Sequence, residues 1–185
     1  MNIILMGYRC TGKTSAGRRL AERMGLPFYD TDELVERQRE RTIPQIVAEQ
    51  GWQAFREAET AVIRELSGAD HCVIALGGGA VLDARNIESL KRNGLFVWLF
   101  AAPETIAARM EKDAATGAER PSLTDKTSIG EMNVIIAERE PLYRRLADLA
   151  VDTTRFGTDQ VVEVILSGLR EQIPREDEII KGKEA

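Results

Sequence analysis

Residues 7–14 read Gly7-Tyr8-Arg9-Cys10-Thr11-Gly12-Lys13-Thr14, which fits the pattern G-x-x-x-x-G-K-[S/T]. The apolar run at 3–6 just before it is typical of a buried parallel strand. Apolar residues at helical spacing follow it, at Ala16, Leu20, Ala21 and Met24. Loop N–H groups at the start of a helix favour an anion at one point. The stretch therefore predicts a strand, a phosphate-binding loop and a helix that begins near Lys13.

Two side chains of this loop carry specific chemistry. The Lys13 ammonium supplies a positive charge for the β- and γ-phosphates of a nucleoside triphosphate, and the Thr14 hydroxyl is an oxygen ligand for Mg²⁺. A lone G-K-T at a helix start is also compatible with an ordinary turn. The complete pattern between a strand and a helix favours the phosphate site.

Composition excludes several classes of protein. The 185 residues include 25 Lys and Arg against 30 Asp and Glu, a net charge of −5, which gives no basic field for nucleic acid. The two cysteines, Cys10 and Cys72, suit a reducing compartment, and a single histidine argues against a zinc site. The first strand begins at residue 3 and no apolar run reaches membrane-spanning length. We expect a cytoplasmic protein without a signal peptide.

Strands and helices alternate along the chain. We expect five strands, at 3–6, 28–29, 72–76, 95–100 and 149–151. We expect helices from 13, after 30, over 43–66 with a break near Gly51, over 84–91, from 103, over 129–146 with an interruption at Pro141, and over 159–169. This order predicts an α/β fold of three layers, α/β/α, around a five-stranded parallel sheet.

The domain plan follows from the same pattern. Residues 1–170 form a single domain, and the charged segment 171–185 is an extension of it. The segment 112–124 loses apolar periodicity and collects Gly, Glu, Arg and Pro, which predicts a loop or lid. Thr42 with Gln45 predicts a helix N-cap, and Asp30 with Glu33 a capping-box-like start.

Three groups of residues follow the ends of predicted strands: the phosphate loop, Asp30 with Asp32, and Gly77–Gly79. Ligands of such sheets bind at the carboxyl ends of the strands, so these groups should meet in one cleft. One aspartate can hold Mg²⁺ through water while the other orients a substrate hydroxyl or accepts its proton. The alternative, that both aspartates only cap the next helix, is weaker beside a phosphate loop.

Arginines and glycines supply the remaining candidates. Arg56 or Arg139 can grip a carboxylate, although spacing alone does not separate them from other helix arginines at Arg64, Arg144 and Arg145. The triple glycine is equally compatible with a tight turn or a backbone surface against a substrate. Arg120 either swings over the phosphates or remains an exposed loop charge.

Taken together, these motifs resemble those of the shikimate kinases, small phosphate-loop enzymes of the nucleoside-monophosphate-kinase-like class. The resemblance covers about residues 2–170 and rests on six motifs in order: Gly7–Thr14, Asp30-x-Asp32, Phe55-Arg56-x-x-Glu59, Gly77–Gly79, Arg120-Pro121 and Arg139-x-Pro141-Leu142-Tyr143. It implies ATP-dependent phosphorylation of the 3-hydroxyl of shikimate, on the route to chorismate and the aromatic amino acids. It also implies a monomer.

The resemblance assigns roles by position. Catalysis falls to Lys13, Asp32 and Arg120. ATP is bound by residues 7–15 (Gly7 to Ser15), Arg109 and Arg120, with Arg109 stacking on adenine and the loop after Asp152 closing the other side. Shikimate is bound by Asp32, Arg56, Gly77, Gly78, Gly79 and Arg139, with Glu59 orienting Arg56. Mg²⁺ is bound by Thr14, with Asp30 assisting through water. The region 33–60 then binds shikimate and the segment 112–124 is the lid.

The chain departs from the family's pattern at Cys10, where glycine is usual, at Ser122 after Arg120-Pro121, and in the tail after 170. Because Cys10 lies near a helix N-terminus and Lys13, we expect a lowered thiol pKa, inactivation by iodoacetamide and protection by MgATP.

Other functions remain open from sequence. A kinase of the same fold with another acceptor, such as gluconate or a nucleoside monophosphate, is the nearest, although two arginines for one carboxylate disfavour a neutral sugar. A GTP-dependent switch lacks its Asn-Lys-x-Asp motif after the fourth strand. A catalytically silent kinase-like domain is disfavoured by the intact charged residues.

Overall fold

The computed structural model describes residues 1–115 and 129–172. Its strands are β1 (Asn2–Met6), β2 (Phe28–Asp30), β3 (Val73–Ala75), β4 (Gly94–Phe100) and β5 (Leu149–Asp152). Its helices are α1 (Lys13–Met24), α2 (Thr31–Arg39), α3 (Ile43–Leu66), α4 (Ala84–Lys91), α5 (Pro103–Ala115), α6 (Ile129–Leu146) and α7 (Thr158–Gln172), with a 3-10 turn at Ala80–Leu82. All five predicted strands are therefore confirmed.

The five strands form one parallel sheet in the order β2-β3-β1-β4-β5. Side chains alternate along β1, so Ile4 and Met6 join a core on one face while Ile3 and Leu5 join a core on the other. The first core includes residues of α3, α4 and α6, and the second includes residues of α1 and α7. The predicted three-layer α/β/α fold is confirmed.

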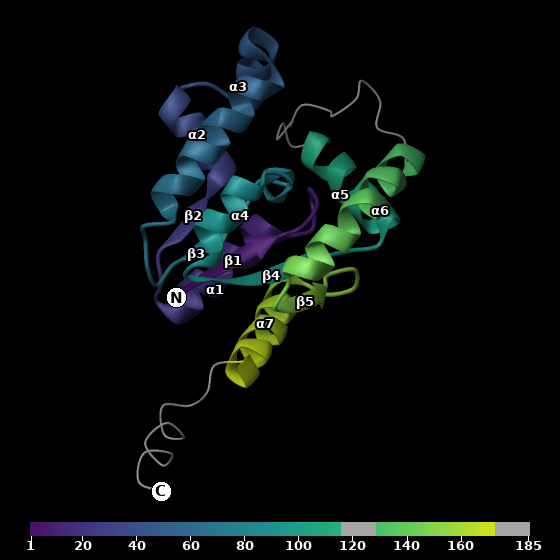
Figure 1. The fold of residues 1–185 in the computed structure, drawn as a ribbon. Coiled ribbons are helices and arrows are strands. Elements are labelled where there is room, and N and C mark those ends of the chain that lie inside the picture. The colour runs from purple at the N-terminus through teal and green to yellow at the C-terminus, as the bar shows by residue number, and fades with distance from the viewer. Residues whose placement is uncertain (116–128, 173–185) are drawn as a thin grey trace, which may run out of the picture.

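Because every strand is parallel, all carboxyl ends lie at the same edge of the sheet. Figure 1 shows α2 and α3 on the side of β2, and α5 with α6 on the side of β5. The phosphate loop leaves β1 between these two groups, since β1 is the central strand. This edge is where the site has to form.

Local signals account for several helix boundaries. The Thr42 hydroxyl accepts a hydrogen bond from the Gln45 N–H and the Gln45 side chain accepts one from the Thr42 N–H, so α3 begins with the predicted capping box. Gly51 interrupts α3 with φ 80° and ψ 169°, as its position predicted.

Two sequence expectations need correction. Helix α6 continues through Pro141, from Ile129 to Leu146, so the expected interruption does not divide the helix. Helix α7 continues to Gln172, so the first residues of the expected extension belong to the last helix. The rest of that extension, 173–185, lies outside the described residues.

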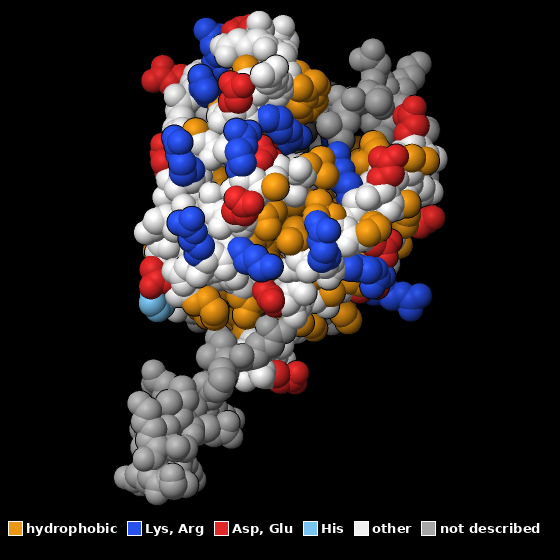
Figure 2. Space-filling view, in the orientation of Figure 1, with side chains coloured by type: hydrophobic (Ala, Val, Ile, Leu, Met, Phe, Trp, Pro, Cys, Tyr) orange, Lys and Arg blue, Asp and Glu red, His pale blue; other side chains and the backbone are white. Residues whose placement is uncertain are grey.

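Surface charge is mixed. On the face in Figure 2, Lys and Arg side chains are separated by neutral and acidic ones, and hydrophobic side chains gather between them. Within the described part of the chain, no helix has the length and apolar character needed to cross a membrane.

Candidate active site

The phosphate loop is held in shape by its own side chains. Thr11 Oγ1 donates to the Tyr8 carbonyl at 2.8 Å, and Lys13 Nζ donates to the same oxygen at 2.7 Å. A Cβ on Gly7 would overlap the Leu99 carbonyl, and Gly7 has φ 145°, so only glycine fits there. The loop is therefore preorganised, with a buried Lys13 beneath it.

Thr14 and Asp30 form a pair at the start of α1. Thr14 Oγ1 donates to Asp30 Oδ2 at 2.7 Å, while Asp30 Oδ1 accepts from the Asp32 N–H at 3.0 Å and the Glu33 N–H at 3.4 Å. Asp30 thus caps α2 and also faces the phosphate loop. The Glu33 side chain pairs with Arg18 instead of completing a capping box. A hydroxyl beside a carboxylate is an oxygen donor set that suits Mg²⁺.

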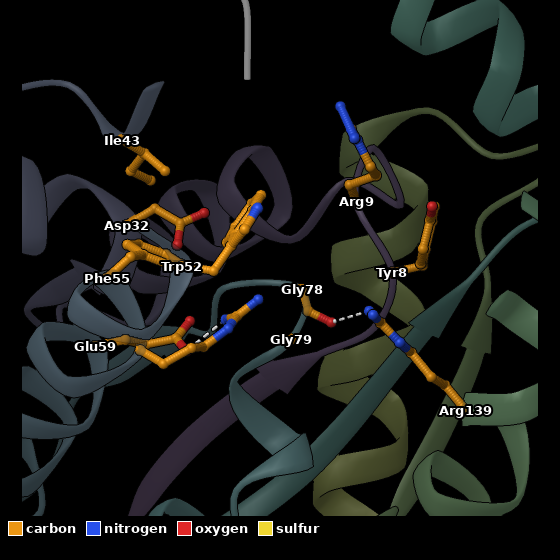
Figure 3. Close-up of a pocket in the computed structure, with 11 residues that line it drawn as sticks. Tyr8, Arg9, Asp32, Ile43, Trp52, Phe55, Glu59, Gly78, Gly79 and Arg139 are labelled. Atoms are coloured by element: carbon orange, nitrogen blue, oxygen red, sulfur yellow. Dashed lines mark hydrogen bonds and ion pairs between the residues drawn. The ribbon is translucent and has the colours of Figure 1, made fainter. Parts of the chain in front are cut away.

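An acceptor cleft opens beside this loop. Ile43, Trp52 and Phe55 supply its apolar wall. Its charged lining consists of Arg9, Asp32, Arg56, Glu59 and Arg139. Figure 3 shows Arg139 approaching Gly78 from the side opposite Asp32, Trp52 and Glu59. The cleft can hold a small polar molecule among three guanidinium groups and two carboxyl groups.

Two of the three cleft arginines, Arg56 and Arg139, are fixed by different contacts. Arg139 Nη1 donates to the Gly78 carbonyl at 3.1 Å, and the Tyr143 hydroxyl donates to the same oxygen at 3.0 Å. Arg56 Nη1 donates to Glu59 Oε2 at 2.6 Å. Each guanidinium lines the cleft while part of it is anchored, which preorganises it for an anion.

The three glycines at 77–79 have different surroundings. The Gly77 N–H donates to Thr31 Oγ1 at 2.8 Å, and a Cβ on Gly77 would overlap both Asp32 and Glu59. Gly78 and Gly79 line the cleft, whereas Gly77 does not belong to its lining. Bare backbone at 78 and 79 is what a substrate can approach closely.

A second cleft of about 900 Å³ lies on the other side of the loop, lined by Cys10, Thr11, Gly12, Ser15, Ala16, Arg109, Lys112, Asp113, Thr153, Phe156, Gly157, Thr158 and Val161. Arg109 donates to the Cys10 carbonyl at 3.2 Å, to Thr153 Oγ1 at 3.1 Å and to the Thr153 carbonyl at 2.6 Å. Thr153 Oγ1 also bonds the Thr11 carbonyl at 3.1 Å, so the loop after β5 is tied to the phosphate loop. This cleft adjoins the phosphate loop, which is where the nucleoside of a bound nucleotide is expected.

Comparison with known proteins decides the family. A family model described as shikimate kinase matches residues 9–170. The shikimate kinase of Syntrophus aciditrophicus (strain SB) is 45% identical over 179 residues, which is 92% of this chain and 92% of that protein. Shikimate kinase from Acinetobacter baumannii in complex with shikimate has a TM-score of 0.86 at 34% identity, and the match covers 94% of this chain and 95% of that one.

The chain belongs to the shikimate kinase family. A gluconokinase from Sinorhizobium meliloti 1021 also matches, with a TM-score of 0.58 at 21% identity, which shows a common fold alone.

Several contacts of this shikimate kinase family member were not evident from the sequence. The side chains of Tyr8 and Arg9 line the acceptor cleft, although the motif placed both residues with ATP. Thr31 and Thr153 bind backbone groups of the site and had no motif to mark them. Arg120 lies outside the described residues, as does most of the expected lid, whereas Lys112 and Asp113 belong to α5.

Cys10, the departure from the family's usual glycine, lies in the left-handed region with φ 57°. Glycine adopts that conformation without strain, which is a physical reason for glycine at this position. The expected low thiol pKa is wrong: burial raises the pKa of Cys10, and Asp113, 3.5 Å from its sulfur, raises it further against Arg9 and Lys13.

We therefore expect slow alkylation of Cys10. Less thiolate is present at neutral pH when the thiol pKa is raised, so iodoacetamide should label Cys10 more slowly than free cysteine at pH 7.5. Asp113→Asn should lower the thiol pKa and speed labelling severalfold, measured by peptide mass spectrometry. Asp159→Asn, on the surface of α7, is the matched control. Equal labelling rates in wild type and Asp113→Asn would show that Asp113 does not control the thiol.

Proposed function

We propose that this protein transfers the γ-phosphoryl group of ATP to the 3-hydroxyl of shikimate, giving shikimate 3-phosphate and ADP on the route to chorismate. One observation carries the proposal. Arg56 and Arg139 line a single small cleft with Asp32, and that cleft adjoins the phosphate loop. A molecule with one carboxylate and several hydroxyls suits this arrangement.

The carboxylate of shikimate lies between the two guanidinium groups, and its ring contacts Trp52 and Phe55. The backbone of Gly78 and Gly79 hydrogen-bonds its ring hydroxyls. Clamping the carboxylate at one end directs a hydroxyl at the other end toward Asp32 and the phosphate loop. Fixing both reactants in this way removes much of the entropic barrier.

Transfer then needs little covalent chemistry from the protein. The acceptor oxygen bonds to the γ-phosphorus as the bond from that phosphorus to the bridging oxygen of ADP breaks, and Asp32 accepts the hydroxyl proton. Lys13 contacts the transferring phosphoryl group and stabilises its charge. Thr14, with Asp30 acting through water, would hold Mg²⁺, and the ion would neutralise phosphate charge. Arg120 remains a predicted contact of the same phosphoryl group.

The remaining expectations follow the resemblance. The protein acts as a cytoplasmic monomer, with residues 33–60 as its shikimate-binding region and 1–170 as a single kinase domain. Helix α3 supports the assignment of 33–60 as the shikimate-binding region, since it carries Arg56 of the cleft. Sedimentation at micromolar concentration tests the monomer.

The function is tested by ADP release from MgATP with and without shikimate, followed by phosphorus NMR of the product. Shikimate-dependent release with a 3-phosphate product is the expected result. ADP release with gluconate or a nucleoside monophosphate in place of shikimate would overturn the assignment of shikimate as the acceptor. ATP binding without transfer to any acceptor would indicate a catalytically silent domain.

Gly79→Ala should weaken shikimate binding selectively. A Cβ at Gly79 would overlap Arg56 Nη2 and lie 2.8 Å from its Cζ, so the flexible guanidinium must move. Gly79 has φ −114°, which alanine adopts freely, so folding should be little affected. Losing one charge-assisted contact predicts a KM for shikimate about tenfold higher, with the KM for ATP unchanged.

Gly68→Ala is the control, because its Cβ would lie at an ordinary 3.5 Å from the Glu65 carbonyl. An unchanged KM for shikimate in Gly79→Ala would exclude Arg56 from the substrate clamp.

A further inference from the structure

Glu59 is a buried carboxyl group whose two oxygens have different surroundings. Its side chain is 1% exposed, and Oε2 accepts the hydrogen bond from Arg56. Oε1 is buried and has no hydrogen-bond partner among the described residues. Orienting Arg56, the role implied by the resemblance, accounts for Oε2 alone. An unpartnered buried carboxylate oxygen is costly, and binding a proton removes that cost.

The unpartnered oxygen lies beside a second carboxylate. A Cβ on Gly77 would overlap both Glu59 Oε1 and Asp32 Oδ1, so the two carboxyl groups converge on one point next to the acceptor cleft. Two ionised carboxylates so placed repel each other, whereas a protonated Oε1 places a hydrogen-bond donor next to the Asp32 carboxylate.

Burial and the neighbouring charges determine whether Glu59 is protonated or ionised. The pKa of Glu59 is raised to about 7: burial is the largest cause, Arg56 acts in the opposite direction, and Asp32 and Asp83 add to the effect of burial. Asp83 is itself paired with Arg85. Among the described residues, the cation that lowers the pKa of Glu59 is Arg56, which is one of the three arginines that line the cleft.

We propose that Glu59 takes up a proton when a carboxylate substrate engages Arg56, and that this proton couples substrate affinity to pH. The inference rests on the proposed function, since it requires an anion at Arg56. A bound carboxylate neutralises part of the guanidinium charge that favours ionised Glu59. The protonated form of Glu59 then becomes more populated, with Oε2 still accepting from Arg56 and Oε1–H donating toward Asp32. Glu59 is a positioning residue that acts through these two neighbours.

The sign of the pH dependence follows. Before binding, Glu59 ionises near pH 7; after binding, its pKa is higher. Between these two values binding takes up protons, so affinity falls as pH rises through and above 7. The carboxylate of shikimate is ionised throughout this range. We expect the Kd for shikimate at pH 8.5 to be about fivefold or more above that at pH 6.5.

Calorimetry of shikimate binding to the full chain tests the proposal without any variant. At pH 7.5, binding enthalpies in buffers of different ionisation enthalpy should report uptake of a fraction of a proton. Glu59→Gln matches the protonated acid in shape, with an oxygen for Arg56 and an N–H for Asp32. It should take up no proton and bind at pH 8.5 within about threefold of wild type at pH 6.5. Glu57→Gln, on the exposed side of the same helix, is the matched control and should keep the wild-type pH dependence.

Each outcome decides between the two proposals. Binding of shikimate with no proton uptake in wild type, or with uptake retained in Glu59→Gln, would overturn the inference and leave the proposed function standing. Weak binding of Glu59→Gln at every pH would reduce Glu59 to an orienting group that needs its charge. Failure of wild type to bind shikimate at any pH, while ATP binds, would overturn the proposed function and the inference with it.

Discussion

Lys13→Met is expected to lower kcat about 10³-fold or more while the protein remains folded and still binds nucleotide. The Lys13 side chain is buried beneath the phosphate loop, with its ammonium bonded to the Tyr8 carbonyl at 2.7 Å. In the proposed reaction, that position puts a fixed positive charge beside the γ-phosphoryl group of ATP. Methionine keeps most of the length of the side chain and removes its charge. The substitution should therefore reduce stabilisation of the transition state more than it reduces the stability of the fold.

The measurement is ADP release at saturating MgATP and shikimate, alongside nucleotide binding and thermal unfolding of the same preparation. Lys91→Met, in the last turn of α4, is the control for a changed lysine elsewhere and should keep full activity. Activity of Lys13→Met within tenfold of wild type would show that Lys13 only shapes the loop, and that another cation carries the phosphoryl charge.

Residues that follow strand ends were predictable because topology decides where they lie. Lys13 and Asp32 each come shortly after a short apolar strand, and a parallel sheet brings such positions to one edge whatever the intervening chain does. Asp30 was harder, since capping a helix and facing the phosphate loop were treated as alternatives. The structure shows both, with one carboxylate oxygen on each task.

Local sequence pattern does not predict which arginine of a helix reaches the cleft. Spacing did not separate Arg139 from Arg144, because both lie on α6. Arg144 pairs with Glu140 on the surface, whereas Arg139 reaches Gly78, 61 residues away in sequence. Contacts between distant segments leave no periodic signal, so only the resemblance singled out Arg139.

The pKa values of the Cys10 thiol and the Glu59 carboxyl likewise depend on contacts that the sequence does not reveal. A helix N-terminus and Lys13 argued for a low thiol pKa, but Asp113, 103 residues further on, lies against the sulfur. Burial then acts in the same direction as Asp113. Sequence lists the charged groups and leaves open which of them are buried and which meet, and pKa depends on both.

Asp32→Asn should lower kcat by about 10²- to 10⁴-fold, with a smaller effect on shikimate binding. Asparagine retains the shape and can still hydrogen-bond the acceptor hydroxyl, but it does not accept a proton at neutral pH. The start of α2 should survive, because the Asp30 carboxylate bonds the backbone N–H of residue 32 and not its side chain. Single-turnover transfer from ATP to shikimate separates this chemical step from product release.

Glu33→Gln, the next residue along α2, is the matched control. It makes the same carboxylate-to-amide change on a side chain that pairs with Arg18 on the surface, so it should leave kcat unchanged. A kcat of Asp32→Asn within threefold of wild type would mean that the hydroxyl proton leaves by another route. In that case proton transfer to a carboxylate contributes little to the barrier, and positioning by Arg56 and Arg139 together with the charge of Lys13 carries the reaction, as a loose phosphoryl transition state allows.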